Sequence, residues 1–158
     1  ASCLVRSEMC IRDRLWVNQL QLTVADMVTE AHDTHHPISA NDYYEDQKEE
    51  AARRGRGFRE ERIPKFLAYF ERVLAGPTAW LAGGRRWTYV DLSLFHLVDG
   101  LLYAFPKRMG TVASDYPNVM ALHARVASLP ALQPYFDSGR RLPFGECIFR
   151  QYRELDAA

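Results

Sequence analysis

Apolar residues return at helical spacing along most of this chain. Over residues 15–32 they recur every three or four positions, which predicts an amphipathic helix. The same spacing runs over residues 58–74, where Pro64 predicts a kink or a helix restart. The glycines within residues 53–57 predict a break or a loosened turn just before it. The first half of the chain is therefore expected to form two long helical stretches.

The most apolar stretch is residues 88–105. Its apolar side chains cover most of the helix circumference, and a helix of that kind belongs inside a core. Pro106 is expected to end it, because proline lacks the backbone N–H that would continue the helix. We therefore expect a central buried helix around which the rest of the domain packs.

The start of this helix carries a specific signal. Thr88 and Asp91 have the spacing of a capping box, in which each side chain accepts from the other residue's backbone N–H. Trp87 and Leu92 are spaced to form a hydrophobic staple over the box. These four residues predict where the central helix begins.

The remaining segments are also helical or irregular. Residues 107–115 are expected to be a connection, Pro117 opens a further helix that ends near Pro130, and residues 131–136 form a short one. Residues 140–158 are apolar without a regular period, so we expect them to pack back onto the domain. No stretch alternates for long enough to predict a strand. The fold class is all-α, with five or six helices around the central one.

Composition narrows the class of protein. Twenty basic and twenty acidic residues leave no net charge, so neither nucleic acid nor an anionic membrane is an expected partner. No apolar run is long enough to span a bilayer. The cysteines Cys3, Cys10 and Cys147 form no Cys-x-x-Cys motif, which argues against a disulfide framework or a zinc knuckle. A reducing, cytoplasmic setting is expected.

Residues 1–14 differ from the rest of the chain. They show no clean period, and VRSEMCIRDR resembles the translation of a sequencing adapter. We expect residues 1–14 to be a non-native or disordered leader, with residues 15–158 forming the helical domain.

The order of motifs resembles a known family. YFERVL at residues 69–74 is followed by WLAGG, by the Thr88 to Asp91 box, by VDGLLYAFP and by YPNVMALHARVASLP. This succession resembles the C-terminal all-helical domain of cytosolic glutathione transferases, most closely the group that contains the alpha, pi and sigma classes.

The resemblance implies a function for the whole protein. Members conjugate glutathione, a co-substrate rather than a cofactor, to small hydrophobic electrophiles, or reduce peroxides. They are typically homodimers. Their thiol-activating residue lies on a thioredoxin-like domain that is absent from these 158 residues. We therefore expect no catalytic residue in this chain, and no transferase activity from the chain alone.

The resemblance also implies site residues. Members place a carboxylate on this domain near the glutathione amine, across the dimer. The matching position here is Thr34, and the nearest acid is Asp33. Tyr44 falls where pi-like members place a tyrosine of the electrophile site, and a helix-packing role is an equal alternative.

Two other interpretations stay open at this point. His32 and His36 are four residues apart and are able to share a metal ion on one helix face, but Pro37 disrupts that geometry, so no metal site is expected. Alternatively, the domain is a non-catalytic interaction module of the kind found in translation elongation factor subunits. The segment from His32 to Lys48 favours the enzyme group.

Overall fold

The structure is a computed structural model that describes residues 2–83, 86–145 and 147–157. Every regular element in those ranges is helical, which confirms the predicted all-α class. In chain order the elements are α1 (Ser2–His32), the 3-10 turn η1 (Tyr44–Gln47), α2 (Lys48–Gly57), the π-helical turn η2 (Phe58–Arg62), α3 (Ile63–Leu74), α4 (Tyr89–Ala104), α5 (Pro106–Val112), the 3-10 turn η3 (Ala113–Asp115), α6 (Pro117–Ala127) and α7 (Gln133–Phe136).

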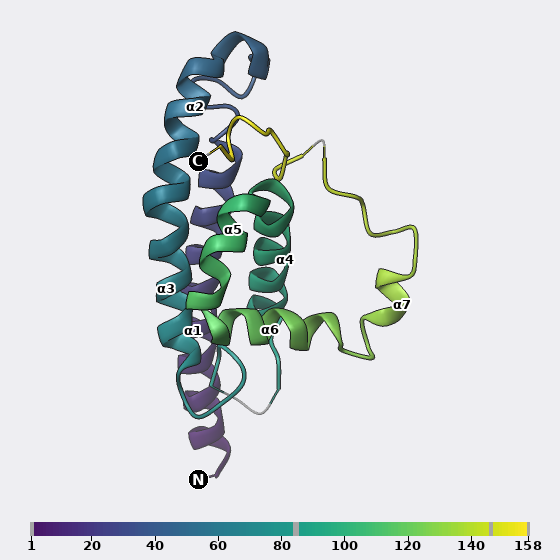
Figure 1. Cartoon of the computed structure of the whole chain (residues 1–158). Helices are drawn as coiled ribbons and strands as arrows, with labels where there is room; N and C mark the ends of the chain where they lie inside the picture. Colours follow the sequence, from purple (N-terminus) through teal and green to yellow (C-terminus); the bar gives the residue numbers. More distant parts are fainter. Residues whose placement is uncertain (1, 84–85, 146, 158) are drawn as a thin grey trace.

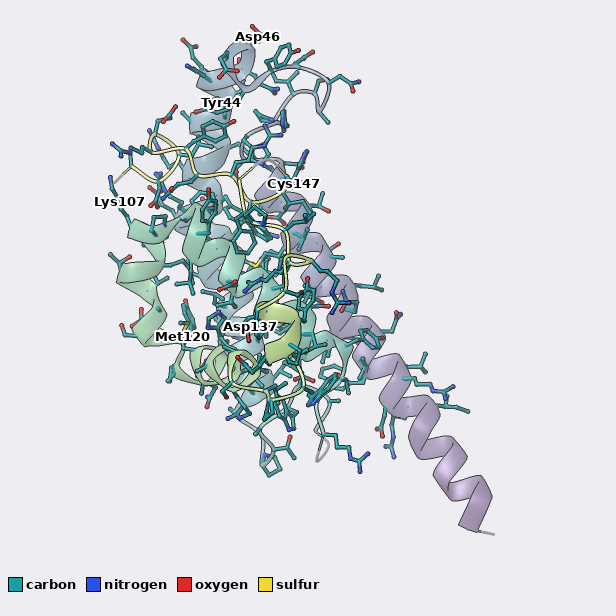
Figure 2. The ribbon with its side chains drawn as sticks, turned by 90° about the vertical axis from the view of Figure 1, so that its right-hand side faces the viewer. Tyr44, Asp46, Lys107, Met120, Asp137 and Cys147 are labelled. Atoms are coloured by element: carbon teal, nitrogen blue, oxygen red, sulfur yellow. The ribbon has the colours of Figure 1, made fainter. Side chains whose placement is uncertain are left out.

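The first half of α1 extends away from the rest of the domain (Figure 2). Residues 11–15 are exposed, contact with the core begins at the partly buried Trp16, and Val17 is buried. The indole Nε1 of Trp16 also donates to the carbonyl of Leu81 at 3.3 Å. Helix α1 thus runs through the segment that was expected to be a leader. The non-native origin of residues 1–14 stays a prediction. Packing against the domain begins close to the expected boundary at Leu15. The side chains of Cys3 and Cys10 lie outside the described part of the chain.

α2, η2 and α3 form one continuous rod (Figure 1). The predicted break at residues 53–57 is wrong, because both glycines there keep helical backbone. The irregularity lies further on, in η2, where the N–H of Ile63 donates to the carbonyl of Phe58 five residues earlier. Pro64 comes directly after it, in the first turn of α3. Pro64 has no backbone N–H to donate, and the π-helical turn η2 before it accommodates this. The helix restart that Pro64 predicted is thus the start of α3.

α4 is the central helix, enclosed by α1, α5 and α6 (Figure 1). Its start has the capping box between Thr88 and Asp91. Oδ2 of Asp91 accepts from the backbone N–H of Thr88 at 2.7 Å and from its hydroxyl at 3.0 Å. Oδ1 accepts from the N–H of Leu81 at 2.9 Å, so the same carboxylate also holds the preceding loop. Trp87 is 40% exposed, and the staple to Leu92 stays a prediction.

The expected connection over residues 107–115 is wrong, since it contains helix α5 and the turn η3. Pro106 ends α4 and at the same time opens α5 in its first turn. The N-terminus of α5 is capped from far away: the carboxylate of Asp156 accepts from the N–H groups of Lys107 at 2.7 Å and Arg108 at 3.1 Å. Nothing in the local sequence signals this cap.

The C-terminal tail packs back onto the domain, as predicted. It crosses the end of the bundle at which α1 ends and α2 begins (Figure 1). Phe149 and Leu155 are buried. Phe149 lies against Gly100, where a Cβ atom would come within 2.5 Å of its ring. The guanidinium of Arg59 donates to the carbonyl of Leu155. The tail is thus part of the core rather than a loose end.

Candidate functional site

A charged groove of about 530 Å³ lies beside the end of α1. Arg62 of η2 holds Glu30 of α1 through two hydrogen bonds, from Nε at 2.7 Å and from Nη2 at 2.6 Å. Such a bidentate pair fixes both side chains, and the hydrogen bond to Glu30 raises the pKa of Arg62. A lining of this mixed charge suits a zwitterionic ligand or a surface of mixed charge. The groove is lined by three carboxylates and three guanidinium groups, those of Glu30, Glu50, Glu61, Arg53, Arg54 and Arg62.

Asp33 lies just past the end of α1, with its side chain 38% exposed. Nη2 of Arg54 is 3.8 Å from its Oδ2, and Nδ1 of His32 is 3.4 Å from its Oδ1. A carboxylate at a helix C-terminus faces the negative end of the helix dipole, so neighbouring cations stabilise it. Because these contacts are long and partly exposed, Asp33 remains accessible to a further cation such as an ammonium group.

Thr34 differs sharply from its neighbour. It is 1% exposed, and its hydroxyl donates to the carbonyl of Ala31 at 2.7 Å. Counting along the sequence places Thr34 and Asp33 at the same site, but the end of α1 turns one inward and the other outward. Contact of either residue with glutathione stays a prediction, and only Asp33 presents a polar group at the surface.

Tyr44 is buried beneath the tail. Its ring stacks on Tyr152 with 3.8 Å between ring centroids, and its hydroxyl donates to Oε1 of Glu154 at 3.1 Å. Burial, reinforced by that hydrogen bond, raises the pKa of the Tyr44 phenol. In this arrangement Tyr44 performs the packing role that the sequence left open. Its electrophile-site role stays a prediction that requires Tyr152 and Glu154 of the tail to move away from it.

The three histidines at the end of α1 pack against one another. His32 and His36 stack with 5.1 Å between centroids, and Nε2 of His35 hydrogen-bonds the carbonyl of Ile148 at 3.0 Å. Across the described residues, no group of three or more His, Cys, Asp or Glu side chains is arranged to hold a metal ion. The cluster is tied to the tail rather than open to a ligand.

A second hollow, of about 420 Å³, lies between α4 and the segment around α7. Aromatic and aliphatic side chains form most of its lining, including Phe95, Phe136 and Leu132. His96 borders it and stacks on Phe144 with 5.5 Å between centroids. An apolar hollow edged by a few polar groups is the usual form of a site for small apolar molecules.

Asp99 of α4 joins α6 and the segment after α7, and its partner Arg141 lines this hollow. Its Oδ1 accepts from Nε2 of His123 on α6 at 3.1 Å, and its Oδ2 accepts from the guanidinium of Arg141. These hydrogen bonds lower the pKa of Asp99. The guanidinium of Arg141 also lies over the ring of Phe136 at 5.1 Å. The only sequence signal was a charged residue within an apolar helix, which did not reveal its partners.

In the part of the chain that the structure describes, no helix combines the length and the apolarity needed to cross a membrane.

Cys147 is a free, exposed thiol that lines neither the groove nor the hollow.

Most of the helical domain resembles known proteins. The family model for the glutathione S-transferase C-terminal domain matches residues 32–139, which run from the end of α1 through α7. A protein of Dictyostelium discoideum that carries the name glutathione S-transferase alpha-5 is 39% identical over 77 residues. That match covers 48% of this chain and 36% of the relative, so the chain spans well under half of the relative's length. By the extent of the family match, the chain belongs to the glutathione S-transferase C-terminal domain family.

Proposed function

We propose that this chain is the helical domain of a cytoplasmic, homodimeric glutathione transferase. The whole protein conjugates glutathione to small hydrophobic electrophiles, or reduces peroxides with it. Glutathione enters as co-substrate, and no cofactor is needed. The observation that carries the proposal is the family match over residues 32–139.

The groups in this chain suit binding rather than thiol activation. A tyrosine activates a thiol by stabilising the thiolate, and this requires an accessible hydroxyl. Tyr44 is 3% exposed, and its hydroxyl already donates to Glu154. In this proposal the activating group lies on a thioredoxin-like domain outside these 158 residues.

Asp33 is the group proposed to bind glutathione. The γ-glutamyl amine of glutathione is cationic, and a carboxylate is its natural partner. Asp33 is accessible at the end of α1, next to a groove in which carboxylates and guanidinium groups balance. In the proposed dimer this surface faces the glutathione of the other subunit. The apolar hollow beside α4 offers surface for the electrophile.

The proposal is tested by joining this chain to the thioredoxin-like domain of a glutathione transferase. Conjugation of a chlorinated aromatic electrophile is expected from the joined protein and not from the 158-residue chain alone. Removing the thiol-activating group removes nucleophile activation and positioning together. Conjugation by the isolated chain, or an inactive but folded joined protein, contradicts the proposal.

The role of Asp33 is tested separately in the joined protein. Asp33→Asn removes the charge but keeps the shape, and we expect the KM for glutathione to rise about tenfold with kcat little changed. Asp26→Asn, an exposed site on α1, is the matched control and is expected to leave KM unchanged. An unchanged KM in Asp33→Asn removes Asp33 from the site while leaving the transferase proposal intact.

A further inference from the structure

The three histidines at the end of α1 form a compact cluster. The ring centroids of His32 and His35 are 5.1 Å apart, those of His32 and His36 are 5.1 Å apart, and those of His35 and His36 are 4.7 Å apart. Three imidazole rings thus lie in mutual contact. A proton taken up by one of them raises the energy of a proton on the next.

His35 links this cluster to the tail. Because the carbonyl of Ile148 only accepts, Nε2 of His35 must carry the proton of their 3.0 Å hydrogen bond. Nδ1 of His35 is then an acceptor, and it is buried without a hydrogen-bond partner. Nδ1 of His36 is buried and unpartnered in the same way. The geometry therefore holds His35 as a neutral imidazole.

The surroundings of His35 oppose a second proton. His35 is 1% exposed, and burial disfavours its charged form. Burial first, then the nearby positive charges, lower the pKa of His35 to about 4, although the hydrogen bond to Ile148 acts in the opposite direction. Burial likewise lowers the pKa of His36. The groups next to the cluster are Asp33 and the backbone of Asp42 from the loop after α1, with Arg150 and Tyr152 from the tail. Arg54 of α2 is near the cluster through Asp33, and Tyr44 of η1 is near it through Tyr152.

Acidic groups do little to offset these positive charges. Asp33 is the nearby carboxylate that favours protonation of His36, and it already faces Arg54 at 3.8 Å and His32 at 3.4 Å. Glu154 is engaged with the hydroxyl of Tyr44. A proton on His35 would therefore enter a buried site beside other basic groups.

The tail that begins at Ile148 covers Tyr44. Tyr152 stacks directly on the Tyr44 ring, and Glu154 accepts from its hydroxyl. Figure 2 shows Tyr44 at the end of the bundle that the tail crosses. Release of the segment from Ile148 to Glu154 would expose an aromatic side chain that is 3% exposed in the closed arrangement.

We propose that His35, with His32 and His36, is a proton-sensitive latch that holds the tail over Tyr44 when neutral and releases it when protonated. The proposal does not depend on the transferase activity. The closed state binds fewer protons than the open state, because an exposed histidine titrates at its ordinary pKa of 6.5. The closed state is therefore favoured above pH 6.5, and it is progressively weakened as the pH falls from there to about 4. Within that window the opening equilibrium rises about tenfold per pH unit.

The latch is tested first on the unmodified chain by NMR, with labelled histidine and tyrosine side chains. From about pH 7.5 to about pH 4, we expect the His35 ring to titrate far below pH 6.5, with the Tyr44 and Tyr152 ring signals moving in step. Far-ultraviolet circular dichroism is expected to stay constant, because only the tail opens. Ordinary titration of His35, unchanged tyrosine signals, or loss of the whole fold with the tail each overturns the proposal.

A variant of His35 tests the effect of protonation separately from the effect of the hydrogen bond to Ile148. His35→Gln keeps an amide N–H to donate to the carbonyl of Ile148 and has no group that protonates in this range. We expect its tyrosine signals to lose their pH response. His123→Gln, which retains a donor toward Asp99 of α4, is the matched control and is expected to respond as the unmodified chain does. A folded His35→Gln variant with the original pH response contradicts the latch, and if the variant does not fold, the titration of the unmodified chain decides.

Discussion

Two buried carboxylates cap two helices of this domain by different routes. Asp91 caps α4 from within the same helix, three residues from Thr88. Asp156 caps α5 from the tail, 49 residues from Lys107. Their accessible surfaces are similar, at 0% and 4%. The chemistry is the same in both places, and only the separation along the chain differs.

That separation changes what each cap does. Asp91 acts inside a short loop whose closure costs little entropy, so its bonds form together with the helix. Asp156 closes a long loop, and its position depends on the packing of Phe149, Tyr152 and Leu155 beneath and beside the tail. The cap of α4 therefore specifies the fold, while the cap of α5 depends on the tail segment that we propose is released by protonation of His35. Substitutions in the two regions test this difference.

The largest effect is expected from Asp91→Ala. The substitution removes the acceptor of the buried N–H of Leu81 and of the partly buried N–H of Thr88, and together these losses should lower the free energy of unfolding by roughly 3 to 5 kcal/mol. Urea unfolding followed by circular dichroism measures it. Thr88→Ser, which keeps the hydroxyl that donates to Asp91, is the mild control. A loss below about 1 kcal/mol would show that the box is not a main determinant of α4.

Gly100→Ala is expected to displace the tail. Its Cβ would lie 2.5 Å from ring atoms of Phe149, a distance that forces the tail outward and lowers the free energy of unfolding by roughly 1 to 3 kcal/mol. Amide exchange of residues 149–155 should increase while α4 stays protected. Gly57→Ala meets no atom within 4 Å, so it should instead stabilise the helix by up to about 1 kcal/mol. Equal effects at the two glycines would argue against the close packing of Phe149.

Asp156→Ala should be smaller than Asp91→Ala. It removes the acceptor of the first N–H groups of α5, which still reach water, at roughly 1 to 2 kcal/mol. Hydrogen exchange should rise in α5 and in the tail and not in α4. Asp156→Asn keeps one acceptor oxygen, and its free energy of unfolding is expected to lie between those of Asp156→Ala and the unmodified chain. If Asp156→Ala destabilises as much as Asp91→Ala, the tail is not separable from the core.

The smallest effect is expected at Asp99, and it depends on pH. Hydrogen bonds from His123 and Arg141 lower its folded pKa, so its stabilisation is present above the ordinary value of 3.8 and is lost as the pH falls through the lowered value. Asp99→Asn should therefore reduce stability by about 1 kcal/mol at neutral pH and by less at a pH below the ordinary value of 3.8. Urea unfolding at both pH values measures this. A constant difference would mean that the charge of Asp99 is unimportant.

Local signals in the sequence predicted much of the fold. Helical spacing located α1, α3, α4 and α6, and the Thr88 to Asp91 pair located the start of α4, because these features involve residues a few positions apart. The prediction of α5 as a connection was wrong because its cap comes from Asp156. The expected break at residues 53–57 was wrong because the helical rod continues and adjusts only before Pro64.

For the candidate site, too, the sequence indicated some features and the structure decided others. Sequence counting brought Asp33, Thr34 and Tyr44 forward as candidates, but it contained no information on which of them reaches the surface. The backbone at the end of α1 decides between Asp33 and Thr34. The tail decides the state of Tyr44, through Tyr152 and Glu154 more than a hundred residues away.

The sequence by itself determined the helical class, the central helix with its cap, and the family. Each of these depends on contacts that span about one helical turn, or on a succession of such local patterns. The tertiary structure alone decided the cap of α5, the burial of Tyr44 and the link between His35 and Ile148. These depend on where a tail without periodicity comes to rest, and that is set by the shape of the surface it packs against.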